Sequence, residues 1–237
     1  MHSLGLRAFA VPAALWFAAW PLAAQRREFT ILAGANYTGA TGGNLDKSER
    51  QTGFLAGVSF RMPRSARISF ETELLVVQHR LSGERAPSSL PPIQVGPISD
   101  AAKLLFAQIP LLLRFQRGYS AVRPVRPFLL LGPYIGVRLA CRRDVVEGDS
   151  TVRHTDCSAT PNDVVAGPGV FIPAAYQNVD VGFIGSVGVE IGRIAFAGRI
   201  QRSIVDLVSE SAIPTSPFDK SRLWSGSVSI EYLLRVL

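Results

Sequence analysis

Apolar and polar residues alternate through most of this chain, and residues 104–116, LLFAQIPLLLRFQ, show the pattern clearly. Every second residue from Leu105 to Phe115 is apolar, whereas the positions between them include Gln108 and Arg114. A period of two indicates a β-strand, because successive side chains leave a strand on opposite faces. The stretch therefore predicts a strand with one apolar face and one mixed face. The rest of the chain decides whether the apolar face meets a protein core or lipid.

The same period predicts eight strands, and no segment of comparable length shows a helical period. The strands are expected at residues 28–38, 52–62, 67–80, 104–116, 127–141, 180–192, 194–202 and 222–236. On each of them one face is mostly apolar, and the other carries glycine, serine and charged residues of both signs. The chain is therefore predicted to be all-β.

The charges on the polar faces are nearly balanced in sign. They include Arg61, Glu71, Glu73, Arg114, Arg138, Glu190, Arg199 and Glu231. A membrane barrel turns its apolar face to lipid and its polar face inward. Charges inside it must be paired, because an unpaired buried charge is very costly. We therefore expect these eight residues to form a mutually neutralising network in the interior of a barrel.

The connections between the predicted strands alternate in length. The long ones are residues 39–51, 81–103, 142–179 and 203–221, and the short ones are 63–66, 117–126 and Arg193. Outer-membrane barrels combine long extracellular loops with short periplasmic turns, and both of their termini are periplasmic. The alternation predicts an eight-stranded antiparallel up-and-down transmembrane β-barrel with periplasmic termini. A further hairpin at 164–172 would make ten strands.

Two prolines fall inside predicted strands, although a closed barrel has no free edge on which a missing N–H is harmless. They are Pro110 and Pro133. A local β-bulge is expected at each of them.

The N-terminal stretch has the layout of a secretory signal peptide. It carries Arg7, then an apolar run, then small residues at Ala23 and Ala24. A transmembrane anchor is the alternative, but the run is shorter than the roughly 20 residues needed and contains two prolines. We expect residues 1–24 to be a cleaved signal peptide and residues 25–237 to be the barrel domain. The expected location is the outer membrane of a Gram-negative-type bacterium.

The exported part contains two cysteines, Cys141 and Cys157. An even count in an oxidising compartment predicts a disulfide, with two free thiols as the alternative. The bridge would close a loop of about 15 residues, worth about 3 kcal/mol. Only His154 stands near the pair, so no metal site or cofactor is expected. The formal net charge of +7 comes without long basic runs and does not indicate nucleic-acid binding.

Five segments of the chain resemble, in their order, the PorT-like outer-membrane β-barrel family. They are ILAGANYTG, TGFLAGVSF, IPLLLRF, PFLLLGPYIGV and GSVGVEIGRIAFAGRI. The resemblance covers essentially the whole mature chain and implies a small, porin-like barrel; a few members of the family are tied to secretion machinery. One departure is the end of the chain, YLLRVL, which lacks the usual terminal aromatic residue. The resemblance implies fold and location more than activity.

An eight-stranded barrel is just wide enough for side chains to fill its interior. We therefore expect a structural barrel, or one that binds through its loops, with a largely filled interior. One alternative is a narrow, porin-like solute or anion channel, in which Arg61, Arg114, Arg138 and Arg199 would line the path. The other is a soluble, secreted, lipocalin-like binding barrel with the two faces inverted.

Catalysis is the remaining class of function, because some small outer-membrane barrels modify lipid A. His79 lies near Ser82 and Glu84 in sequence, which suggests a serine–histidine–acid arrangement. The spacing fits no deacylase pattern, so we expect no enzyme activity. The expected partners are outer-membrane lipids, the barrel-assembly machinery during insertion, and an unidentified extracellular or periplasmic protein.

Overall fold

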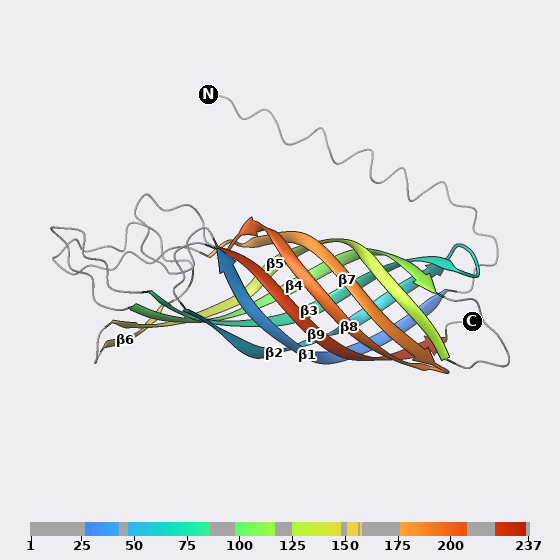
Figure 1. Cartoon of the computed structure of the whole chain (residues 1–237), viewed down its shortest axis with the longest axis horizontal. Helices are drawn as coiled ribbons and strands as arrows, with labels where there is room; N and C mark the ends of the chain where they lie inside the picture. Colours follow the sequence, from blue (N-terminus) through green and yellow to red (C-terminus); the bar gives the residue numbers. More distant parts are fainter. Residues whose placement is uncertain are drawn as a thin grey trace, which may run out of the picture.

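The computed structural model describes residues 27–42, 47–85, 98–116, 125–147, 151–155, 157, 176–207 and 221–235. These residues form nine strands (Figure 1): β1 Glu28–Gly42, β2 Lys47–Pro63, β3 Ile68–Arg85, β4 Ile98–Gln116, β5 Val125–Glu147, β6 Thr151–Thr155, β7 Val179–Ile191, β8 Ile194–Asp206 and β9 Ser221–Arg235. No helix long and apolar enough to cross a membrane occurs among them.

Eight of the strands form a closed ring. Neighbours along the chain pair antiparallel, β5 pairs with β7, and β9 returns to pair with β1. Within the described part of the chain, the short β6 pairs with the loop-side end of β5 alone and stands outside the ring. The predicted eight-stranded antiparallel barrel is therefore confirmed. The hairpin predicted at 164–172 and the signal peptide predicted at 1–24 lie outside the described residues.

The strands are strongly tilted, as Figure 1 shows. The stagger of the ring is found by moving from each residue to its partner on the next strand. Starting at Tyr37 of β1 and passing through β9, this path ends at Met62 of β2, and the neighbouring Arg61 pairs with Glu28 of β1. The circuit therefore returns to β1 about ten residues from its start, and this stagger requires a tilt of roughly 35–45°. An antiparallel barrel of this kind has no free strand edge within the ring.

The two faces of each strand sort as the alternation predicts. On β4, Ile109 and Leu111 are 47% and 57% exposed on the outside, whereas Gln108 and Arg114 are fully buried inside. From Leu105 to Phe115 the outward residues of β4 are all apolar. Ten steps of ~3.4 Å on a strand tilted by ~40° give an apolar band about 25 Å tall. The apolar face lies outside, so the lipocalin-like alternative, which needed it inside, is wrong.

The two ends of the barrel differ. At the turn end, residues 64–67 and the pair Gly192–Arg193 join neighbouring strands. Gly192 has φ 64°, a conformation that suits glycine in a two-residue hairpin turn. At the opposite end, here called the loop end, β2 to β5 continue past the ring and β6 joins them (Figure 1). The strands are thus longer at the loop end than the alternation predicts. The pattern is inverted there, since inward residues such as Leu81 and Ala102 are apolar and outward residues such as Lys103 are polar.

The prolines do not cause the expected bulges. Pro110 pairs with Tyr134 and Pro133 with Phe183, and the register does not shift at either proline. Pairing is instead interrupted beside Pro110, between Thr72 and Leu75 of β3. The missing N–H is thus accommodated by a gap in the ladder rather than by an extra residue.

A bulge does occur in the β4–β5 pair, nearer the loop end than Pro110. Leu105 pairs with Ala140, but the next residue, Phe106, pairs with Arg138, so Leu139 is an extra residue on β5. A bulge of one residue reverses the faces of the strand beyond it. Arg143 is accordingly fully buried, whereas Arg142 is exposed on the outside of the sheet.

Candidate functional site in the barrel interior

An ion-pair cluster occupies the turn half of the interior. Arg61 contacts Glu28, Glu190 and Glu71, at 2.7, 3.2 and 3.3 Å respectively. Arg114 contacts Glu71 and Glu190, both at 3.1 Å. Arg126 also pairs with Glu190. Three arginines therefore neutralise three glutamates in a single connected cluster.

Two of the ion pairs cross the bore. Arg61 on β2 contacts Glu190 on β7, and three strands separate β2 from β7 in either direction around the ring. Arg199 on β8 makes two hydrogen bonds to Glu73 on β3, of 2.8 and 2.7 Å, and these strands are also opposite. Both pairs are nearly excluded from solvent. The opposite walls are therefore tied together through the space that a channel would need.

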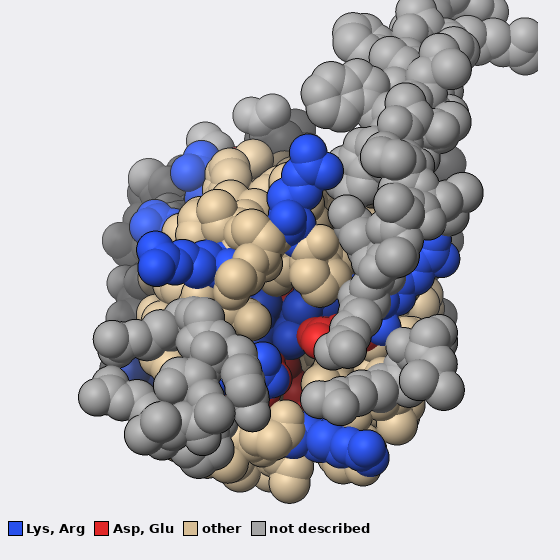
Figure 2. Space-filling model, turned by 90° about the vertical axis from the view of Figure 1, so that its right-hand side faces the viewer, with Lys and Arg blue, Asp and Glu red and all other residues tan. Residues whose placement is uncertain are grey.

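Arg114 is packed as well as paired. Its guanidinium carbon lies 3.6 Å from the centroid of the Phe128 ring, and its Nε donates to Gln116 at 3.1 Å. Arginine suits this position because its planar group can stack on an aromatic ring while its edges donate to carboxylates. Figure 2, which faces the turn end, shows a hollow with acidic and basic atoms inside it and basic side chains around its rim.

Six of the eight charged residues predicted from sequence take part in these contacts, and two do not. Arg138 lies apart: its guanidinium donates to the carbonyl of Tyr176 and to Oδ1 of Asn178, at 2.7 and 2.6 Å. Glu231 is buried in the interior, but neither of its carboxylate oxygens has a hydrogen-bond partner among the described residues. It interacts electrostatically with three arginines, Arg61, Arg114 and Arg199, and with the glutamates Glu71 and Glu73.

Among the described side chains of this region, the charges do not cancel. Its glutamates are Glu28, Glu71, Glu73, Glu190 and Glu231, and its arginines are Arg61, Arg114, Arg126 and Arg199. Four of these glutamates are matched by direct contacts with arginine. Glu231 is the extra acid among the described side chains.

The interior is less polar than the sequence pattern predicts, because apolar side chains fill much of it. Leu32, Leu55, Leu75 and Val77 form one cluster. A second cluster contains Leu112, Phe128, Leu130, Tyr134, Ile184, Ala195 and Ala197. A third, in the loop half, contains Ala40, Leu81, Ala102, Leu104, Phe106, Cys157, Tyr176, Leu207 and Leu223. Most of these residues lie on strands whose two faces are both apolar at those positions, so alternation does not single them out.

His79, the candidate for catalysis, is fully buried beside polar groups of β1. Its Nδ1 lies 3.0 Å from Thr38 Oγ1 and 3.4 Å from Asn36 Nδ2. Its ring also meets the edge of Phe106, with centroids 5.8 Å apart. Ser82 lies on the opposite face of β3, so the two side chains do not meet. Within the described ranges no group of acids, histidines and cysteines could hold a metal ion.

The predicted disulfide between Cys141 and Cys157 is confirmed, with the two Cα atoms 5.7 Å apart. Cys157 is buried against the apolar cluster of the loop half, and Cys141 packs at its edge. The bridge therefore links Cys157, which follows β6, to β5 at the loop end of the filled interior.

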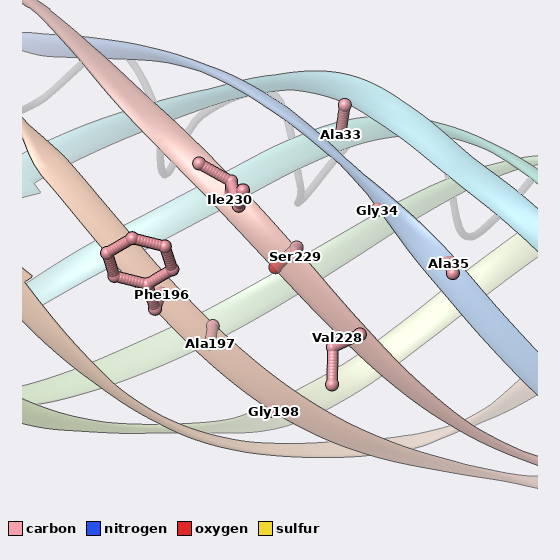
Figure 3. Close-up of a pocket in the computed structure, with 9 residues that line it drawn as sticks. All are labelled: Ala33, Gly34, Ala35, Phe196, Ala197, Gly198, Val228, Ser229 and Ile230. Atoms are coloured by element: carbon pink, nitrogen blue, oxygen red, sulfur yellow. The ribbon is translucent and has the colours of Figure 1, made fainter.

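A shallow groove lies on the outer wall rather than in the bore (Figure 3). Its small residues include Ala33, Ala35 and Gly198, and Phe196 and Ile230 stand beside them on β8 and β9. These five residues belong to the lipid-facing side of their strands. The groove therefore suits acyl chains rather than a water-soluble ligand.

Three solved structures are among those similar to this chain. The attachment invasion locus protein Ail of Yersinia pestis, solved with the heparin analogue sucrose octasulfate, is 11% identical, with a TM-score of 0.39 over 88% of this chain and 99% of that one. Neisserial surface protein A is 14% identical, with a TM-score of 0.40 over 86% and 96%. OprG of Pseudomonas aeruginosa is 13% identical, with a TM-score of 0.42 over 90% and 98%. Similarities this distant carry no functional information.

No curated protein matches the sequence. A family model does: residues 22–209 match the family described as outer membrane protein beta-barrel domain. The match covers most of the chain and agrees with the closed ring of eight strands and its apolar exterior. The chain therefore belongs to the outer membrane protein beta-barrel domain family, and its location is the outer membrane.

Proposed function

We propose that this protein is a closed outer-membrane barrel that does not conduct solutes and that binds a partner through its loop end. In this proposal the loop end is extracellular and the two termini are periplasmic. The short connections at 64–67 and 192–193 support this orientation, because periplasmic turns are short in such barrels.

The observation that carries the proposal is the pair of ion bridges across the bore. Arg61 with Glu190 and Arg199 with Glu73 connect opposite walls. Between these bridges and the loop end, buried side chains such as Leu104 fill the interior. A solute would have to break buried, charge-assisted hydrogen bonds, which are strong in a water-poor interior.

Features of the loop end support a binding role there. β3, β4 and β5 continue beyond the ring, where β6 extends the sheet, and the Cys141–Cys157 bridge anchors the segment that follows β6. Binding residues are often carried by loops on a rigid scaffold. An extended sheet with a covalent anchor provides such a scaffold.

Conductance in a planar bilayer tests the closed interior. We expect the purified, folded protein to add no steady conductance steps above the bare bilayer. Steady, anion-selective steps would instead establish the alternative of a narrow anion channel, which the charged hollow at the turn end favours (Figure 2). The double variant Glu73→Ala/Arg199→Ala removes one bridge and is the matched test, because it should show brief openings that the native protein lacks.

Proteinase added to intact cells tests the orientation. Cleavage at the loop end is expected, with the turn at 64–67 protected until the outer membrane is permeabilised. The reverse pattern would contradict the proposal. The absence of enzyme activity, the narrower PorT-like assignment and insertion by the barrel-assembly machinery remain predictions of the sequence.

A further inference from the structure

Three basic residues lie side by side on the outer wall, at the loop end. Arg80 of β3 pairs directly with Lys103 of β4, and Lys103 pairs directly with Arg142 of β5. All three point outward, away from the buried interior of the barrel. Adjacent strands are about 4.8 Å apart, so the row spans roughly 10 Å. We call these three residues the basic row.

The basic row lies immediately beyond the lipid-facing band. On β4, Lys103 is the next outward residue after Leu105, and on β5, Arg142 follows Ala140. On β3 the outward residues change from Val76 through Gln78 to Arg80. The three cations therefore stand at the depth where apolar lipid chains give way to headgroups.

Among the described side chains, few groups could neutralise the charge of the basic row. Lys103 and Arg142 make no ion pair among the described residues, and Arg80 donates only to the neutral Gln78, at 3.1 Å. Among the described side chains, the acids on nearby strand positions are Glu49, which pairs with Ser82, and Asp144, which pairs with Ala101. Neither lies in the row itself. Elsewhere at this end Arg222 is paired with Asp206, at 3.3 Å.

Like charges directly opposite one another destabilise a sheet. The arrangement also depends on an irregularity, because the extra residue Leu139 is what turns Arg142 outward beside Lys103. Bulges re-aim side chains in this way. A stretch of sheet that places three cations together, without an acid among them, has a surface suited to an anion with more than one negative charge.

We propose that the basic row binds the phosphate groups of a phosphorylated membrane lipid. Arginine and lysine are the residues that recognise phosphate, and basic residues at a membrane surface attract anionic headgroups. Because the row adjoins the lipid-facing band, we expect the phosphate to belong to a lipid, whose acyl chains would pack on the apolar outer residues of the same strands. This inference goes beyond the proposed function and does not depend on which end is extracellular.

The test measures lipid binding by the purified barrel in a neutral detergent. The probes are lipid A with two phosphates and the same lipid with both phosphates removed. We expect the native protein to bind the phosphorylated form at least tenfold more tightly. The variant Arg80→Gln/Lys103→Gln/Arg142→Gln should lose that preference, since each cation near an anionic surface contributes roughly a fivefold effect.

Arg202→Gln is the matched control. Arg202 is also an exposed, outward arginine at the loop end, but its strand partners are Phe183 and Trp224. Its affinity for the phosphorylated lipid should change less than twofold. A mobility shift on boiling confirms that each variant is folded. The single variant Lys103→Gln, with a severalfold loss expected, replaces the triple variant if that one fails to fold.

Three results would overturn the proposal. The first is binding by the triple variant, or by its single replacement, that is as tight as binding by the native protein. The second is a loss of affinity in Arg202→Gln as large as that in the triple variant, which would mean that net charge alone is responsible. The third is complete displacement of the lipid by inorganic phosphate at millimolar concentration, which would make free phosphate the ligand.

Discussion

Arg199 and Glu73 are 126 positions apart in the sequence and lie on opposite walls of the barrel, yet they form two parallel hydrogen bonds of 2.8 and 2.7 Å. Such a fork-to-fork pair is geometrically specific as well as strong. It fixes the distance between β3 and β8 from the inside. The stability of the barrel should therefore depend on the pair rather than on either residue alone.

Removing one partner tests this dependence. Glu73→Gln or Arg199→Gln leaves an uncompensated buried charge, and we expect the free energy of unfolding to fall by about 3 to 5 kcal/mol. The double variant should lose clearly less than the sum of the two single variants. Urea unfolding in detergent micelles measures all three. Strict additivity would show that the two residues do not act as a pair.

Glu231 should behave in the opposite way. Its carboxylate is buried without a hydrogen-bond partner among the described residues, and it is the extra acid of the interior. Glu231→Gln removes a charge that costs free energy to bury, so stability at neutral pH should be unchanged or should rise by about 1 kcal/mol. Glu71→Gln is the control, because Glu71 contacts both Arg61 and Arg114 and its loss should destabilise. A large loss for Glu231→Gln would reveal a partner that supports its charge.

Gly34 provides a test of how closely β1 and β9 approach. A Cβ at this position would come within 2.8 Å of the Cα of Ser229, so backbone would have to move. Gly34→Ala should lower the free energy of unfolding by about 1 to 3 kcal/mol. Gly198→Ala is the matched control on the outer face, because nothing lies within 4 Å of its added Cβ, and it should be nearly neutral. Equal effects of the two substitutions would contradict the close approach.

The disulfide should stabilise the loop end rather than the ring. The eight-stranded ring closes through β1 and β9, without the bridge. The double variant Cys141→Ser/Cys157→Ser should therefore keep its mobility shift on boiling. Limited proteolysis between residues 142 and 156 should become much faster, since closing a loop of this size is worth about 3 kcal/mol. Loss of the mobility shift would mean that the bridge is needed for the barrel itself.

The sequence predicts the ring because alternation is strict wherever one face meets lipid, as from Leu105 to Phe115. The sequence is less informative where the interior-facing and lipid-facing residues of a strand are both apolar. Leu104 and Phe106 face the interior but are as apolar as their lipid-facing neighbours. Near the loop end the apolar residues, such as Leu81 and Ala102, face inward, so the strands extend further than a lipid-facing alternation indicates.

The partners inside the barrel are harder to predict than the residues that face it. Which glutamate meets Arg199 depends on stagger and tilt, which no local pattern contains. Arg138 shows the same limit, because its partners, Tyr176 and Asn178, come from a segment with no alternation to place them. The reversal beyond Leu139 is also invisible in the residues themselves, since an extra leucine looks like any other lipid-facing one.

The bulge at Leu139 determines which face of the sheet each later residue of β5 occupies. Beyond it, Cys141 and Arg143 face inward and Arg142 faces outward, so one extra residue sets both the disulfide and the basic row. Loss or gain of a single residue between Leu139 and Cys141 would exchange these faces together, whereas a change of two would restore them. Natural variants of this strand should therefore differ in length there by even numbers, and the disulfide and the basic row should be inherited or lost as one unit.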